Sequence, residues 1–104
     1  MDIFGMMQNM QQEMDKTKQK LDVLTVTGEA GNGSISVTAT GNKKVTNISI
    51  SASLLADGDA DALEDLLMVA INRALDKAEE LSQNEMQKVA GGLLPPGFNI
   101  PGLF

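Results

Sequence analysis

A long amphipathic segment between Asp61 and Val89 constrains the fold of this chain more than any other feature. Apolar residues recur there three or four positions apart, as on one face of a helix. The stripe consists of Leu63, Leu66, Leu67, Ala70, Ile71, Ala74, Leu75, Ala78, Leu81, Met86 and Val89. Such a helix is roughly 40 Å long, whereas a compact domain of this size has a radius of gyration of about 13 Å. One end must therefore project, and the stripe requires cover from another helix or another chain.

Local signals mark both ends of this helix. Asp61 followed by Glu64 resembles a capping box, and we expect Gly91 and Gly92 to end the helix. The neighbouring acids suit the positive end of the helix dipole: Asp57, Asp59 and Asp65. A site for a hard cation is the alternative, but the spacing lacks the glycine and the final glutamate of a calcium loop.

The composition excludes most catalytic and metal chemistry. The 104 residues allow one domain, whose 42% hydrophobic content is enough for a small core. Aromatic residues make up only 3%, so the core must be aliphatic and Met-rich. The sequence has neither Cys nor His, which removes disulfides, thiolate metal sites and the commonest general base. We therefore expect a protein that is not an enzyme and that has neither a cofactor nor a metal site.

The net charge of −6 lies in the C-terminal half, because residues 1–50 are balanced and residues 51–104 carry the excess of acids. A pI of about 4.4 argues against a strongly basic nucleic-acid binder, although a local basic patch remains compatible with it. Met1–Phe4 has no basic, apolar signal sequence, and no apolar run is long enough to span a membrane. We expect a cytoplasmic protein.

Residues 3–24 predict a second amphipathic helix. Its heptad-like seam is Ile3, Met7, Met10, Met14, Thr17, Leu21 and Leu24. We interpret this seam as a surface for helix packing, lined by flexible methionines. Two alternatives are a promiscuous groove for other proteins and a helix lying at a membrane interface, although the latter favours more aromatic residues and lysines.

The hydrophobic period changes to two after Leu24 and predicts three strands, at residues 24–27, 34–40 and 45–51. Ile35, Val37 and Ala39 fall on one face of the second strand, and Ile48 and Ile50 should point inward from the third. The offset between Val45 and Ile48 indicates a bulge or a strand start. Turns are expected at residues 28–33 and 41–44, and a short helical turn at residues 53–55. The glycines of residues 28–33 could instead form a phosphate loop, but such a loop requires a following helix.

The predicted fold class is α+β: a long N-terminal helix, a three-stranded antiparallel meander and a long C-terminal helix. A small sheet with open edges favours pairing with a second copy. We expect a domain at residues 1–92 and a Pro- and Gly-rich apolar tail at residues 93–104. Because Phe98, Ile100 and Leu103 are apolar, this tail should dock on its own dimer or on a neighbouring one.

Three lysines in the first helix form the strongest candidate for a binding surface. Lys16, Lys18 and Lys20 could contact phosphates, with Lys16 and Lys20 on one face and Lys18 opposite. Polar and basic residues that could extend this surface are Gln12, Gln19, Lys43 and Lys44. Lys43 and Lys44 should matter less, because we expect their turn to lie far from the helix. The alternative is an ordinary solvated face, with these lysines paired to Glu13, Asp15 and Asp22.

Several segments in the same order resemble the YbaB/EbfC family of bacterial nucleoid-associated proteins. They are the Met- and Gln-rich first helix and the segments 26–33 (VTGEAGNG), 53–55 (SLL), 63–66 (LEDL) and 94–98 (LPPGF). The resemblance implies a homodimer with paired central sheets, whose first and last helices project like tweezers. It also implies DNA binding of little sequence specificity through those helices, and no catalytic residues.

The resemblance implies that the lysines and glutamines of the two long helices are candidate DNA contacts. The full set is Lys16, Lys18, Lys20, Gln12, Gln19, Gln87 and Lys88. The C-terminal helix departs from this role because it is acidic, with Asp76, Glu79, Glu80 and Glu85 against Arg73, Lys77 and Lys88. Two hypotheses follow: a nucleoid-located homodimer that binds DNA weakly and in a salt-dependent manner, or a dimeric scaffold that binds a protein partner through the Met seam or the tail.

Overall fold

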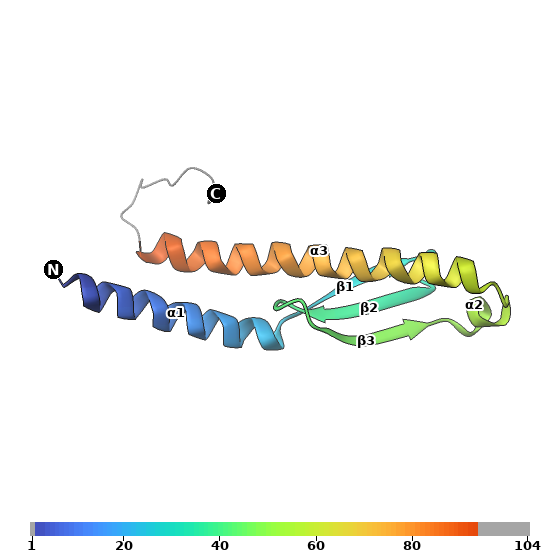
Figure 1. The fold of residues 1–104 in the computed structure, drawn as a ribbon, viewed down its shortest axis with the longest axis horizontal. Coiled ribbons are helices and arrows are strands. Elements are labelled where there is room, and N and C mark those ends of the chain that lie inside the picture. The colour runs from blue at the N-terminus through green and yellow to red at the C-terminus, as the bar shows by residue number, and fades with distance from the viewer. Residues whose placement is uncertain (1, 94–104) are drawn as a thin grey trace.

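The computed structural model describes residues 2–93, and side chains as far as residue 89. The elements in chain order are α1 (Ile3–Val23), β1 (Thr25–Ala30), β2 (Ile35–Thr40), β3 (Val45–Ile50), α2 (Ala52–Ala56) and α3 (Ala60–Leu93) (Figure 1). The predicted order of helix, meander and helix is confirmed, as is the short helical turn before the last helix. The expectation that the tail docks falls outside the described residues.

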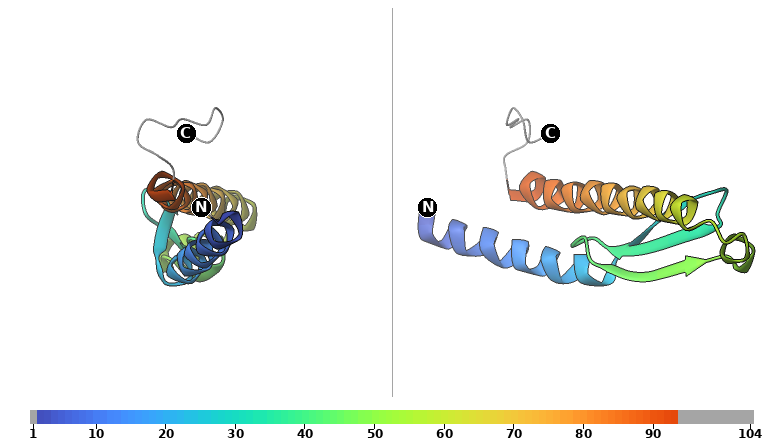
Figure 2. Two further views of the ribbon diagram at one scale, coloured as in Figure 1. Left: turned by 90° about the vertical axis from the view of Figure 1, so that its left-hand side faces the viewer. Right: turned by 45° about the vertical axis from the view of Figure 1, so that its right-hand side comes forward.

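The molecule is elongated, because the two long helices continue side by side past one end of the sheet. Its principal extents are 65 × 25 × 16 Å, and its radius of gyration is 18.8 Å. Figure 1 and the right view of Figure 2 show α1 beside the C-terminal half of α3, whereas the N-terminal half of α3 lies over the sheet. The sequence-based prediction that one end of the long helix projects is therefore confirmed.

Both predicted ends of α3 are wrong. The helix begins at Ala60, because Asp59 rather than Asp61 is the cap: the Ala62 N–H donates to Asp59 Oδ1 at 3.1 Å. At the other end the backbone stays helical through Gly91 and Gly92 to Leu93. Glycine permits a left-handed helix end but does not require one, and a glycine inside a helix costs only about 1 kcal/mol relative to Ala.

The sheet is an antiparallel meander with β2 in the centre. Residues 28–30 belong to β1 rather than to the first turn, because Gly28 pairs with Val37 and Ala30 with Ile35. The turn itself is confined to residues 31–34, where Gly31, Asn32 and Gly33 all have positive φ. The glycine-rich segment is therefore a hairpin, as favoured over a phosphate loop. The predicted bulge in β3 is confirmed, since the register shifts opposite Thr38 and Ala39.

The core lies between α3 and the strands β1 and β2. Its buried members are Ala30, Ile35, Val37, Ala39, Ala70 and Ala74. Small residues on α3 bring the helix close to the sheet, and the predicted inward face of β2 is confirmed. The prediction for β3 is wrong in part: Ile48 pairs with buried Val37 but is 43% exposed, while Ile50 is half-buried. The reason is that α3 passes over β1 and β2 and leaves the same face of β3 uncovered.

Candidate nucleic-acid interface

The C-terminal end of α1 is fixed by the turn between β2 and β3. Leu21 is fully buried, and the Gly41 N–H lies 3.0 Å from the carbonyl oxygens of Leu21 and Leu24, which share it. The Asn42 side-chain amide donates to the Lys18 carbonyl oxygen at 3.0 Å and also to the Asp22 carboxylate. We had expected this turn to lie far from the first helix. That prediction is wrong, because the turn contacts the helix and holds its last turns in place.

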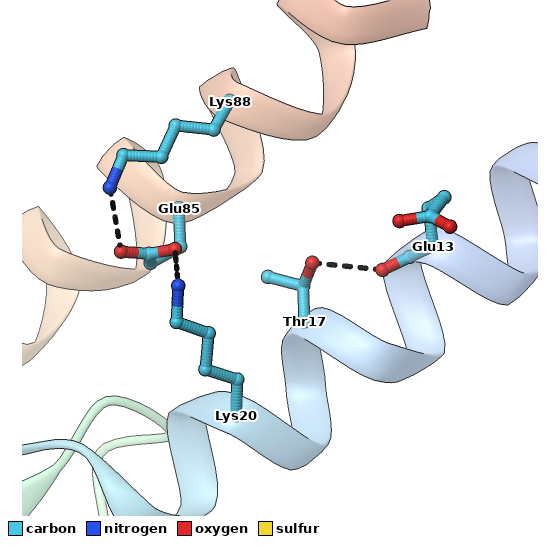
Figure 3. Close-up of polar contacts among 5 residues, drawn as sticks. All are labelled: Glu13, Thr17, Lys20, Glu85 and Lys88. Carbon is cyan, nitrogen blue, oxygen red and sulfur yellow. Dashed lines mark hydrogen bonds and ion pairs between the residues drawn. The ribbon is translucent and has the colours of Figure 1, made fainter.

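An ionic contact joins α1 to α3 further along the projecting pair. Lys20 Nζ lies 2.9 Å from Glu85 Oε2, and Lys88 Nζ lies 3.1 Å from Glu85 Oε1 (Figure 3). Glu85 is only 8% exposed, whereas the side chains of Lys20 and Lys88 are 54% and 70% exposed. The hydrogen bonds from Lys20 and then from Lys88 lower the pKa of Glu85 below its ordinary value. A carboxylate that is shielded from water therefore remains charged between two solvent-facing ammonium groups.

An open hollow of about 320 Å³ surrounds this contact. It is lined by Glu13, Lys16, Thr17, Lys20, Glu85, Lys88 and Val89. The Thr17 hydroxyl donates to the Glu13 carbonyl oxygen at 2.8 Å, so that its polar atom is satisfied inside α1 (Figure 3). Lys16 Nζ lies 3.4 Å from Glu13 Oε1 at the surface of the hollow. The hollow is thus a place where ammonium groups from two helices collect around two carboxylates.

The structure brings together three of the seven candidate residues: Lys16, Lys20 and Lys88. Lys18 lies across α1 from them and is exposed, because residues two apart are about 200° apart around a helix. Gln12 and Gln19 are exposed elsewhere on α1, and Gln87 is half-buried on α3. Within residues 2–89, the side chains of Lys18 and Lys44 form no hydrogen bond or ion pair, so they are the most available cations.

Sequence reasoning missed Glu85 as the residue that links the lysines of the two helices. The spacing of Glu85 and Lys88 is a local signal for an ion pair, but nothing local connects either residue to Lys20, which is 65 positions away. Two other basic residues of α3 donate hydrogen bonds to the backbone of β1. Arg73 donates to the Glu29 carbonyl oxygen at 2.7 Å and Lys77 to the Thr27 carbonyl oxygen at 2.8 Å. Lys43 forms an ion pair with Glu79 of α3, which holds it at the turn.

Neither a metal centre nor a membrane span emerges from the described residues. In residues 2–93 no three Asp or Glu side chains gather in a way that could hold a metal ion. In the same part of the chain no helix is both long and apolar enough to cross a bilayer. The acids near residues 57–65 lie at the start of α3, where Asp59 acts as the cap.

The features above define a small helix–meander–helix protein with two projecting helices and a cluster of lysines between them. The chain belongs to the YbaB/EbfC DNA-binding family, whose model matches residues 1–93. This is a family of DNA-binding proteins and not of enzymes, in agreement with the expectation from composition.

Individual relatives support the same family. The chain is 41% identical over 97 residues to a nucleoid-associated protein of Caldanaerobacter subterraneus subsp. tengcongensis, covering 93% of this chain and 83% of that protein. It is 39% identical over 97 residues to a nucleoid-associated protein of Ruminiclostridium cellulolyticum, covering 93% of this chain and 81% of that protein. A crystal structure of an uncharacterized protein from Helicobacter pylori has the same fold, with a TM-score of 0.76 and 28% identity, over 88% of this chain and 99% of that chain.

Proposed function

We propose that this protein binds DNA in the bacterial nucleoid as a homodimer, with low sequence specificity, through the projecting parts of α1 and α3. The single observation that carries the proposal is the cluster of Lys16, Lys20 and Lys88, which faces solvent between two helices that extend beyond the sheet. Lysines neutralise phosphates without reading bases, so they provide affinity that does not depend on sequence. The family and the names of the relatives support the nucleoid role.

The uncovered face of β3 supports the homodimer. Val45 and Ile48 are apolar and exposed on the side of the sheet that α3 covers only over β1 and β2. Arg73 and Lys77 of α3 reach toward β1, so Met68, on the opposite flank of the helix, lies toward β3 and is also exposed. A second copy placed against this surface would bury apolar groups from both protomers.

The test is a titration of labelled duplex DNA by fluorescence anisotropy at ~50 mM and ~200 mM salt, with two duplexes of unrelated sequence. If Lys16, Lys18 and Lys20 each meet one phosphate in both protomers, the logarithm of affinity should fall with that of salt at a slope of about −5. Replacing the three lysines together by alanine should abolish binding, and the two duplexes should bind alike. Absence of binding at ~50 mM salt by the folded wild-type protein would overturn the proposal.

A second candidate function is a dimeric scaffold for a protein partner. It is favoured by the outer half of α1, where packing of the seam stops: Thr17 and Leu21 are buried, but Met7 is 62% exposed, and Met10 and Met14 are exposed as well. Flexible methionines suit an adaptable protein contact. If DNA binding fails in the titration above, this seam becomes the surface to test, by comparing partner binding of the wild type with that of a Met7→Gln, Met10→Gln double variant.

A further inference from the structure

The contact of Glu85 with Lys20 and Lys88 has the form of a phosphate contact made inside the protein. Each carboxylate oxygen accepts a hydrogen bond from a different ammonium group, at 2.9 and 3.1 Å, and the two donors come from different helices (Figure 3). A DNA phosphate also presents anionic oxygens to lysines in this way. The inner side of the hollow is therefore already occupied by an anion that belongs to the chain itself.

Resting on the proposed function, we propose that Glu85 is an internal competitor of DNA: it holds Lys20 and Lys88, and these lysines contact phosphates only when Glu85 releases them. At the surface of the hollow, the Glu13 carboxylate pairs with the Lys16 ammonium group in a similar way. Competition by Glu85 then lowers the affinity of a surface that would otherwise present several unpaired cations.

The burial of Glu85 makes it a stronger competitor than an ordinary surface glutamate. It is 8% exposed, so little water replaces the lysines when they turn outward. Its pKa is held below the ordinary value, chiefly by Lys20 and then by Lys88, so it is charged at neutral pH. A phosphate that approaches Lys20 therefore meets a fixed negative charge directly behind the ammonium group, and each protomer of a dimer repeats this.

The lysines remain able to reach outward, which distinguishes competition from simple burial. Their side chains are about half exposed or more, and both line the open side of the hollow. A lysine has a flexible stem and can exchange one acceptor for another without movement of the helix backbone. The expected consequence of removing the Glu85 charge is a gain in DNA affinity.

The experiment compares Glu85→Gln with Glu80→Gln in the same anisotropy titration, using the full chain and a labelled duplex of mixed sequence. Glu80 is an exposed glutamate of α3 with no ion pair in the described part of the chain. Its variant makes the same change in net charge as Glu85→Gln but releases no lysine. We expect Glu85→Gln to raise affinity about tenfold at ~50 mM salt and Glu80→Gln about twofold. Lys20 is already counted in the slope of about −5, so the release of Lys88 in each of two protomers should steepen that slope by about 1.8.

A double-mutant cycle identifies the lysines responsible. Lys88→Met should cost more affinity in the Glu85→Gln background than in the wild type, because Lys88 is free only in the former. If Glu85→Gln loses its helical circular dichroism, Glu85→Asp replaces it. Asp keeps the charge, but its shorter side chain cannot hold both lysines, and we expect a gain of about threefold.

The outcomes separate this proposal from the proposed function. If the wild type binds DNA but Glu85→Gln gains no more than Glu80→Gln, the competition is overturned while DNA binding stands. If a folded Glu85→Gln binds more weakly than the wild type, Glu85 positions the lysines instead, and the competition is again overturned. If neither the wild type nor any Glu85 variant binds at ~50 mM salt, both proposals fail.

Discussion

Ala74 lies with its backbone directly on Gly28, so that the helix α3 touches the strand β1 with no side chain between them. A Cβ at Gly28 would lie 2.3 Å from the Ala74 nitrogen and 2.4 Å from the Ala70 carbonyl oxygen. Both atoms are backbone and cannot turn away. This contact determines how closely α3 approaches the sheet, and it requires a glycine inside a strand, where glycine is otherwise unfavourable.

Replacing Gly28 by Ala should therefore destabilise the fold strongly. Because helix and strand would have to separate, we expect a loss of about 2 kcal/mol or more in the free energy of unfolding, measured by urea denaturation. Gly5→Ala is the control, since a Cβ there meets only Asp2 at ordinary distances in an exposed helix, and it should leave stability unchanged or raise it by up to about 1 kcal/mol. A Gly28→Ala protein as stable as the wild type would contradict the close contact.

The exposed face of β3 leads to a prediction about association. Ile48→Glu should convert a dimer of twice the 11.0 kDa chain mass to monomer in sedimentation at micromolar concentration, because a charge would be buried in the proposed interface. Ser49→Glu places the same charge on the other face of β3 and should leave the dimer intact. Equal behaviour of the two variants would place the interface elsewhere.

The acidic residues that pair with lysines predict a loss of stability in acid. The pKa of Glu85 is lowered by Lys20 and then Lys88, and that of Glu79 by Lys43 and then Gln83, in both cases from 4.5. Because the folded pKa lies below the unfolded one, the stabilisation is present above about pH 4.5 and is lost as pH falls through the folded pKa.

Thermal melts between pH 6 and pH 3 measure this dependence. A Glu79→Gln, Glu85→Gln double variant should lose less of its melting temperature over that range than the wild type, because the two shifted carboxylates no longer titrate. Glu64→Gln, Glu80→Gln makes the same change in charge at exposed positions and should follow the wild type. Parallel curves for the wild type and the first variant would contradict the assigned ion pairs.

The two unpaired lysines provide a prediction about DNA contacts. Lys18→Ala should make the salt slope of DNA binding shallower by about 2, since one phosphate contact is lost in each protomer. Lys44→Ala removes another exposed cation, from the β2–β3 turn, and should change the slope by less than about half as much. A larger effect at Lys44 would move the DNA surface from the projecting helices to the turn.

Local pattern was enough to predict most elements, because the periods of 3.6 and 2 report which face of each element is buried. The inward face of β2, for example, follows directly from the alternation of Ile35, Val37 and Ala39. The end of α3 was predicted wrongly, since the glycines tolerate helix as well as ending it. The cap at Asp59 was missed because several acids near the start of α3 are equally suitable in sequence.

The candidate site was less predictable, because it depends on which residues of the two long helices lie opposite each other. The lysines of α1 were identified from their chemistry, but the pairing of Lys20 with Glu85 depends on the register of α1 against α3. That register is fixed elsewhere, by Leu21 and the turn at Gly41. The alternation of apolar residues in β3 indicates which face is suited to burial, but not whether α3 or a second chain covers that face. Ile48 was therefore expected to be buried, although it is exposed in the single chain.

The attachment of α1 at only one end makes the helix a lever. Its fulcrum lies at Leu21, and the part of the helix from Leu21 to Ile3 gives an arm of about 27 Å. A tilt of about 10° at the fulcrum would displace the tip of the arm by about 5 Å, simply from this length. A single substitution beside Leu21 could thus change the span between the tips of α1 and α3 far more than a substitution near the tips themselves.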